Sequence, residues 1–283
     1  MWGERSKKSE AESKKWKVKS ESGFARGTEK RKDMTSTIKT KQFPMAGSWN
    51  NVQAIFRREL HSYFNSAIAY VVIVVFLAII GWFHTSNLFL ANIATMRLVF
   101  EMIPAVFLFV IPAITMRLLS EEKKAGTIEL LTTKPLHDYE IVLGKFLAAW
   151  ALIGIALLLT LVYYATIALL GKVDNGPVIG GYLGLMLMAG VYVAIGLFAS
   201  SLTENQVVAF IIGFVLVFIL FMLDKVLIYM PESLAGIIEF LGIDYHLSNI
   251  ARGVIDSRDV IYFLSLLGFM LYLTVVSLGR RKW

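Results

Sequence analysis

The chain has 283 residues, of which 57% are hydrophobic, and a mean hydropathy of +0.64. This exceeds what a soluble core needs and predicts several membrane spans, since about 18 apolar residues with few charges can cross a bilayer. Cysteine is absent, which excludes disulfides, thiolate metal sites and a cysteine nucleophile.

The net charge of +7 is confined to the N-terminal segment. Residues 1–48 contain 13 Lys or Arg and 6 Asp or Glu, whereas the rest of the chain carries 15 of each sign. The segment has no sustained hydrophobic period, so we predict that residues 1–47 form a disordered basic tail, and it lacks the apolar core of a secretory signal. A contact with anionic lipid or nucleic acid is conceivable for such a tail. We favour a solvated tail with no nucleic-acid partner.

Residues 48–65 predict an amphipathic helix ahead of the membrane domain. Apolar residues recur at helical spacing from Trp49 to Tyr63, with Arg57 and Arg58 between them. Aromatic residues on one face and arginines on the other suit a membrane surface. We expect this helix to lie flat on the cytoplasmic face and to lead into the first span.

Six spans follow, so the predicted fold class is an all-α polytopic membrane domain over residues 66–283. Pro104 and Pro112 should kink the second span, because proline removes a backbone donor. The third is longer than a bilayer needs, so its first turns should project into the cytoplasm. The predicted spans are residues 66–83, 96–119, 140–170, 178–202, 207–223 and 260–278.

Residues 224–259, between the fifth and sixth spans, are too polar and too interrupted to cross a bilayer. Pro231, Gly236 and Gly242 break the segment. We therefore expect short, re-entrant-like helical pieces at the outer surface.

The distribution of Lys and Arg predicts the orientation. With the N-terminus inside, ten of these residues after position 48 fall on the inner side and five on the outer side. Both termini are therefore expected in the cytoplasm. The inner residues are Arg57, Arg58, Arg117, Lys123, Lys124, Lys134, Lys145, Arg280, Arg281 and Lys282, and the outer ones are Arg97, Lys172, Lys225, Arg252 and Arg258.

Residues 117–144 form a long charged stretch between apolar runs, which we call the elbow. Arg117–Lys124 should continue the second span out of the bilayer as a charged helix, with only loose pairing of Glu121 to the lysines that follow it. Gly126 is placed to end that helix, and Asp138 can cap the third span.

A short lateral helix is predicted inside the elbow. Thr127 can cap it and Pro135 stops it. It would present Ile128, Leu130 and Leu131 on a cytoplasmic surface. These apolar side chains could bind a partner, pack back on their own helices or enter the lipid headgroups.

Several stretches carry a family resemblance. FVIPAITMRLLSEEKKAGTIELL across the elbow, RRELHSYFNS, SLTENQVVAFI and RGVIDSRDVIYF resemble the ABC-2 family of ABC transporter permeases. Within that family they are most similar to the gliding-motility-type subunits. The resemblance covers residues 49–283 and leaves residues 1–48 outside. The departures are KPL, where many relatives have an aliphatic residue before Pro135, and Ala67, where relatives often have proline.

The resemblance implies a half-transporter membrane subunit with a cytoplasmic coupling helix that fits a groove on a separate ATPase subunit. The ATPase-coupling residues it implies are Arg117, Glu121, Glu122, Lys123, Gly126, Thr127, Ile128, Glu129, Leu130 and Leu131. A second cytoplasmic contact would be formed by Thr203, Glu204, Asn205 and Gln206.

The resemblance also implies the partners and the location. The subunit would lie in the bacterial cytoplasmic (inner) membrane with an ABC ATPase and a second permease copy or paralogue, and an accessory membrane protein is a further candidate partner. No cofactor is expected in this chain, because ATP and Mg would bind the partner subunit. The motif G-x-x-x-x-G-K-[ST] does not occur in the sequence, so the energy for transport would come from that partner.

The sequence also bears on three other function classes. An ion-coupled carrier usually has ionisable residues at mid-membrane depth, but Glu101, Asp224 and Lys145 fall near span ends, and Glu101 can pair with Arg97. An enzyme is disfavoured, because the four histidines show no metal-ligand spacing and no hydrolase motif occurs. A structural anchor of a motility or secretion machine remains open, although an anchor does not need a kinked elbow.

Deleting residues 1–44 should leave assembly with the ATPase and the coupled ATP hydrolysis unchanged, because the predicted tail contributes no packed surface. Co-purification and hydrolysis rates of the truncated and full chains provide the comparison. A loss of either property would show that the tail belongs to the machine.

Overall fold

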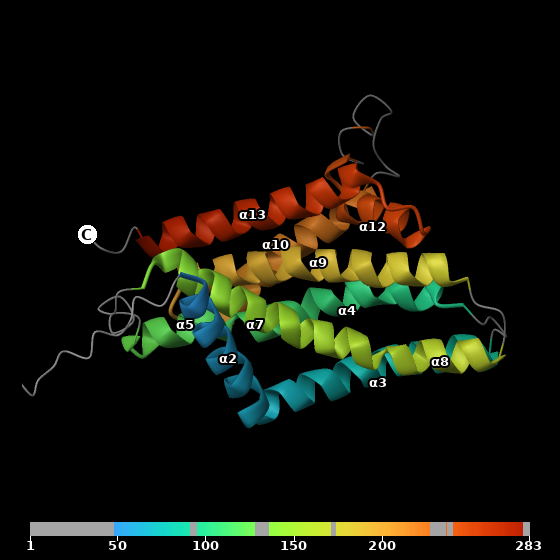
Figure 1. The fold of residues 1–283 in the computed structure, drawn as a ribbon, viewed down its shortest axis with the longest axis horizontal. Coiled ribbons are helices and arrows are strands. Elements are labelled where there is room, and N and C mark those ends of the chain that lie inside the picture. The colour runs from blue at the N-terminus through green and yellow to red at the C-terminus, as the bar shows by residue number, and fades with distance from the viewer. Residues whose placement is uncertain are drawn as a thin grey trace, which may run out of the picture. The chain divides into compact units, whose positions relative to one another are not determined.

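The computed structural model describes residues 48–90, 95–127, 136–170, 174–226, 236 and 240–279. Over these residues the chain is helical between short connections and contains no strand. The helices are α2 (Ser48–Asn65), α3 (Ala67–Leu90), α4 (Arg97–Thr115), α5 (Arg117–Lys124), α7 (Asp138–Leu159), α8 (Leu161–Leu170), α9 (Asn175–Leu202), α10 (Gln206–Val226), α12 (Ile243–Ala251) and α13 (Ser257–Gly279) (Figure 1).

Six helical segments are long and apolar enough to cross a membrane. They are α3, α4 with α5, α7 with α8, α9, α10 and α13, all in the positions that the hydropathy predicts. The predicted fold class, an all-α polytopic membrane protein with six spans, is confirmed. α2 has the bounds predicted for the amphipathic helix.

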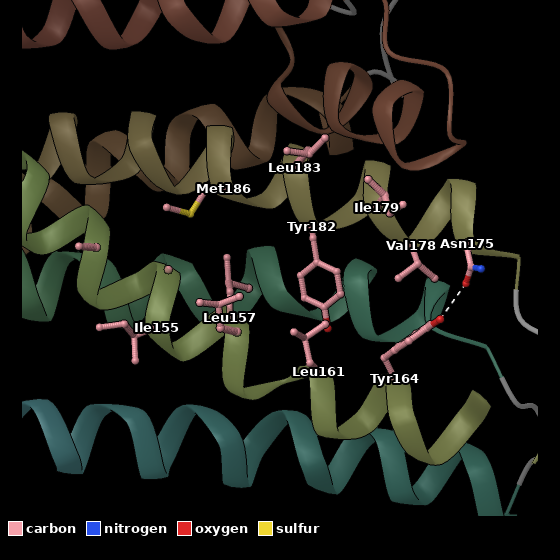
Figure 2. Close-up of a pocket in the computed structure, with 13 residues that line it drawn as sticks. Ile155, Leu157, Leu161, Tyr164, Asn175, Val178, Ile179, Tyr182, Leu183 and Met186 are labelled. Carbon is pink, nitrogen blue, oxygen red and sulfur yellow. Dashed lines mark hydrogen bonds between the residues drawn. The ribbon is translucent and has the colours of Figure 1, made fainter. Parts of the chain in front are cut away.

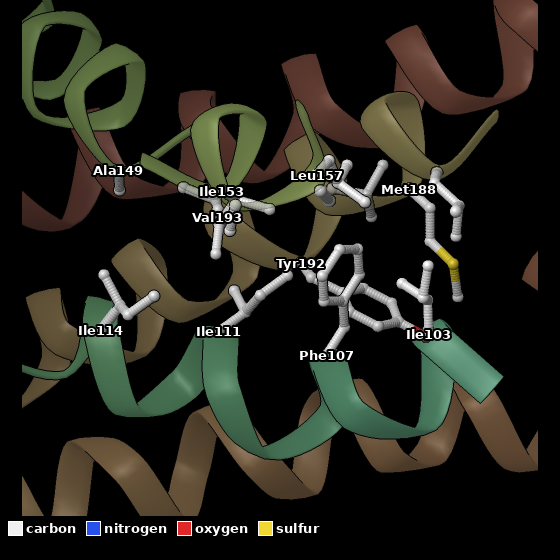
Figure 3. Packing of buried hydrophobic residues seen from close by; sticks show 14 of the residues in the cluster. Ile103, Phe107, Ile111, Ile114, Ala149, Ile153, Leu157, Met188, Tyr192 and Val193 are labelled. Carbon is white, nitrogen blue, oxygen red and sulfur yellow. The ribbon is translucent and has the colours of Figure 1, made fainter. Parts of the chain in front are cut away.

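The fourth span, α9, is the centre of the bundle. It packs against α4, α7, α10, α12 and α13. Within its most apolar stretch 78% is buried, against 17% for α10 and for α13. Figure 3 shows the core where α4, α7 and α9 meet, with Phe107 and Ile111 facing Tyr192 and Val193 beneath Leu157. α10 and α13 therefore leave most of their apolar surface exposed to lipid or to another protein.

Small residues let α9 approach its neighbours closely. A Cβ atom at Gly196 would overlap the Thr115 hydroxyl on α4, and one at Gly180 would overlap the Ile250 carbonyl oxygen on α12. Apolar side chains gain nothing from leaving lipid for another apolar surface, so such close approach supplies much of the association between spans. These two glycines place α9 against two neighbours.

The first span is longer than predicted, since α3 continues to Leu90. His84 lies one turn beyond Gly81, where a span could already end. Its Nε2 is 3.0 Å from the Thr166 hydroxyl oxygen on α8, and its ring stacks on Tyr163. The histidine thus finds a partner inside the bundle, which allows the helix to continue.

The third span lies where predicted, and the structure adds a break at Thr160 that the sequence did not signal. The Thr160 hydroxyl donates to the Leu157 carbonyl at 2.6 Å and lies 2.9 Å from the Tyr182 hydroxyl on α9. A bond back to the preceding turn commonly bends a helix. The break divides the span into α7 and α8.

Part of the segment between the fifth and sixth spans is described. One short helix, α12, lies in this segment, whereas residues 227–235 and 237–239 lie outside the described part. Asp224 at the end of α10 accepts from the Asp244 backbone amide at 2.9 Å. His246 of α12 lies 2.6 Å from the carboxylate of Asp259 on α13. Two polar contacts therefore hold α12 between the fifth and sixth spans.

Gly196→Ala should destabilise the fold by about 1–3 kcal/mol, the usual cost of forcing an extra carbon into a packed core. Gly268→Ala on α13 is the matched control, because no atom lies within 4 Å of the position its Cβ would take. Thermal unfolding in detergent measures both variants. Equal stability of the two would contradict the close packing of α9 on α4.

Candidate functional site

The elbow begins with α5, which follows α4 after the single turn residue Met116. Leu118, Leu119, Ser120 and Lys123 are buried against the bundle, and the opposite face is exposed. The apolar face is therefore satisfied within the chain. The exposed face carries Glu121, Lys124, Ala125, Gly126 and Thr127.

The end of α5 is formed as the sequence predicts. Gly126 has φ +67°, a left-handed conformation that glycine adopts without steric cost, and its amide donates to the Lys123 carbonyl at 3.1 Å. The Thr127 hydroxyl donates back to the Glu122 carbonyl at 3.2 Å. The predicted lateral helix, with Ile128, Glu129, Leu130 and Leu131, lies outside the described residues.

A buried cluster of three charges, which we call the lysine cluster, joins three helices at this end of the bundle. Lys145 on α7 lies 2.8 Å from Glu122 on α5 and 3.1 Å from Glu59 on α2. The side chains are only 3%, 16% and 18% exposed in that order. One ammonium thus ties the elbow to the amphipathic helix and to the third span.

The lysine cluster was missed from the sequence, which places Lys145 only near an inner span end. Its partners are 23 and 86 residues away, so no local spacing signals it. The expected pairing of Glu121 with the following lysines is also wrong, because Glu121 pairs with Arg117 one turn earlier at 3.1 Å. That pair is half-exposed, so it contributes little to stability.

A phenol lies beside the lysine cluster. Burial raises the pKa of Tyr63, the nearby Glu59 carboxylate adds to the rise, and the Arg117 guanidinium opposes it. The phenol therefore remains neutral, and the cluster itself consists of one cation and two carboxylates.

The N-terminus of α7 fastens α2 in place. His137 is the N-cap of α7, so the prediction that Asp138 caps this helix is wrong by one residue. Glu140 accepts from the His137 amide at 3.0 Å and from the Asn51 side chain at 3.2 Å. The Ser48 hydroxyl lies 2.9 Å from that of Tyr139. The amphipathic helix is thereby bound along the start of the third span.

The turn predicted as a second cytoplasmic contact caps two helices. Thr203 ends α9, and its hydroxyl accepts from the Asn205 amide at 3.1 Å. The Asn205 side chain accepts from the Val207 amide at 2.9 Å, at the start of α10. Glu204 and Asn205 are exposed, and Gln206 is the first residue of α10.

The structure brings the two predicted contacts to the same end of the bundle. The Lys123 ammonium of α5 donates to the Ser201 carbonyl, two residues before the turn at Thr203. Ser200 also bonds α5. Thr203–Gln206 and α5 therefore lie at the same end of the bundle (Figure 1).

A comparison with protein-family models matches residues 17–278 to the ABC-2 family transporter protein. The chain belongs to the ABC-2 transporter family. The match begins at residue 17 and so reaches into the basic segment, which the sequence motifs alone leave outside the family. No curated protein matches the chain.

Family membership indicates the role of this chain in a transporter. ABC-2 domains are membrane components of transporters and are not themselves catalytic, and they partner with an ABC ATPase subunit. The chain is therefore a multi-pass membrane permease. Among its described residues, no group of three His, Asp or Glu side chains could hold a metal ion.

The ABC-2 permease also has an apolar hollow of about 710 Å³ between α7, α8 and α9. It opens beside the break at Thr160, and Figure 2 shows Tyr182 and Met186 along its wall. At one end the Tyr164 hydroxyl donates to the Asn175 side chain at 2.7 Å. Because its polar groups are already paired, the hollow presents an almost entirely apolar surface.

Lys145→Met should destabilise the permease by about 3–5 kcal/mol, because Glu59 and Glu122 would be left partly buried without a cation. The double variant Lys145→Met with Glu122→Gln should recover part of the loss. Arg97→Ala removes an exposed pair with Glu101 and should change stability by less than about 0.5 kcal/mol. Thermal unfolding in detergent compares the three, and a Lys145 variant as stable as the Arg97 variant would contradict the cluster.

Proposed function

We propose that this chain is the permease subunit of an ATP-driven exporter of the gliding-motility type, working with a separate ATPase. The observation that carries the proposal is that the elbow is bonded to three other parts of the membrane domain. Glu122 reaches Lys145 and through it α2 and α7, and Lys123 reaches the end of α9. A force on the elbow would therefore reach the second, third and fourth spans together.

The ATPase would bind the exposed face of the elbow and the turn at Thr203–Gln206. The coupling set is Arg117, Glu121, Glu122, Lys123, Gly126, Thr127, Ile128, Glu129, Leu130 and Leu131. Within this set, Glu122 and Lys123 bind side chains and backbone of the bundle, and Glu121 is exposed. Covering each of the three apolar side chains, Ile128, Leu130 and Leu131, would contribute about 1.5–3 kcal/mol to binding.

The mechanism follows from these contacts. ATP and Mg bind the partner subunits, whose closure moves the elbow. Because α5 continues α4 and is tied to α7 and α9, spans two, three and four tilt together. Two permease halves, identical or paralogous, would rotate against each other and alternately close a pathway between them. An accessory membrane protein can join this core.

The location and the cargo are proposed on the same basis. Among the described residues, Arg117, Lys123, Lys124 and Lys145 lie at the elbow end of the bundle, which supports a bacterial inner-membrane location with both termini cytoplasmic. The spans are apolar with few interior polar groups, which fits a lipid-like, polymeric or amphipathic cargo better than a small ion.

Gly126→Pro should abolish the stimulation of ATP hydrolysis by the permease, because proline cannot adopt the positive φ that turns the chain after α5. The tagged chain is purified from detergent with its candidate ATPase, and bound ATPase and hydrolysis rate are measured. The variant should fall to the rate of the ATPase alone.

Gly253→Pro is the matched control. Gly253 has φ +88° and donates to the Ile250 carbonyl at 3.0 Å, so the substitution disturbs the end of α12 as Gly126→Pro disturbs the end of α5. The control should retain ATPase binding and stimulation. A wild-type permease that is stable yet indifferent to the ATPase would overturn the proposal in favour of an ion-coupled carrier or a structural anchor.

A further inference from the structure

Ser200, near the end of α9, uses its entire hydrogen-bonding capacity on the junction between α4 and α5. Its hydroxyl oxygen accepts from the amides of Leu119 and Ser120, each at 3.0 Å, and its proton goes to the Met116 carbonyl at 2.9 Å. A hydroxyl has one donor and two acceptor sites, so all are filled. The side chain is fully buried.

These hydrogen bonds replace backbone hydrogen bonds that a continuous helix would form. In an unbroken α-helix the amides of Leu119 and Ser120 would donate to the carbonyls of Thr115 and Met116, four residues earlier. Here both amides donate to Ser200 instead. The Met116 carbonyl accepts from the Ser200 and Ser120 hydroxyls. A side chain of the fourth span is therefore inserted into the hydrogen-bond ladder of the second.

Two neighbouring features allow the Ser200 side chain to insert here. Pro112 lacks an amide proton, so the ladder is already weakened one turn before Met116. Gly196, one turn before Ser200, lets α9 approach Thr115 so closely that a Cβ atom would overlap its hydroxyl. The hydroxyl of Ser200 thereby reaches backbone amides, which a residue on a more distant helix could not do.

We propose that Ser200 is a positioning residue that holds the second span broken at Met116 and so makes α5 a lever that moves with the end of α9. Ser200 lies three residues before Thr203, where the turn Thr203–Gln206 begins. The same inserted hydroxyl therefore joins both surfaces offered to the ATPase. The transmission role rests on the proposed function, whereas the broken ladder is a property of the permease alone.

Other serines in the described helices show the contrast. Ser265 on α13 donates to the Tyr262 carbonyl within its own helix at 2.8 Å, the ordinary way for a hydroxyl to be satisfied in lipid. Ser200 forgoes that bond and bridges two spans. Ser265→Ala is consequently a control with the same atoms removed and no junction affected.

The test measures the junction directly. The chain has no cysteine, so Arg97→Cys and Lys124→Cys introduce two unique spin-label sites at the ends of the α4–α5 segment. Both positions are exposed. An unbroken helix between them would span about 40 Å. Pulsed electron paramagnetic resonance on the full-length permease in lipid gives the distance distribution.

Ser200→Ala frees the two amides to return to the carbonyls of Thr115 and Met116. The label distance distribution should shift from that of the parent and narrow, because the hydrogen-bond ladder closes between Thr115 and Ser120. With Ser265→Ala the distribution should remain that of the parent. A label-distance distribution of Ser200→Ala that superimposes on that of the parent would overturn the proposal. It would do so even if the variant lost thermal stability.

A second measurement separates this proposal from the proposed function. In unlabelled protein, Ser200→Ala should still bind the ATPase but should stimulate hydrolysis no better than Gly126→Pro. If the distance shifts and stimulation persists, Ser200 shapes the span without transmitting force, and the lever is refuted. If the wild-type chain itself never binds the ATPase, the exporter proposal fails while the distance result still decides whether Ser200 holds the break.

Discussion

The structure depends on the close packing of α9 within a membrane bundle. In hydrocarbon the hydrophobic effect does not draw one apolar helix to another, so spans associate through tight contacts and hydrogen bonds. Gly180 allows close contact with the Ile250 backbone and Gly196 with the Thr115 side chain, and α4, α7, α10 and α13 pack around α9. Because α9 contacts so many other helices, a displacement of its end would also displace the helices packed against it.

Polar bonds between helices are concentrated at the elbow end. The lysine cluster links α2, α5 and α7, and Ser200 with Ser201 links α5 to α9. Burying a charge or a hydroxyl costs free energy unless the group is paired. These bonds therefore fix a defined geometry between the helices, whereas apolar contacts tolerate shifts between them. A short charged helix fastened in this way can transmit a push from outside the membrane, as an ABC-2 permease driven by a separate ATPase requires.

The far end is built differently. There α12 is held to α10 by the Asp224 carboxylate and to α13 by the pair of His246 and Asp259. These contacts close the end of the bundle around α9 without involving the elbow. The apolar hollow beside Thr160 lies between the two polar ends. The molecule thus combines a polar elbow end, joined by hydrogen bonds and ion pairs, with a largely apolar middle.

The six spans, the amphipathic helix and the stop at Gly126 could be predicted from the amino-acid sequence, because hydrophobic periodicity, span length and glycine are local signals that tertiary contacts did not override. The sequence also placed α5 and the turn Thr203–Gln206 as candidate contacts. Which side chains join them could not be predicted, because those contacts link residues far apart in the chain. Lys145 meets Glu59 across 86 residues, and Ser200 enters a helix more than 80 positions earlier. The Thr160 hydroxyl at the break likewise lies 2.9 Å from the hydroxyl of Tyr182 on another helix. The physical reason is that these are bonds between helices, and the spacing of residues along one helix carries no information about the register of its neighbours.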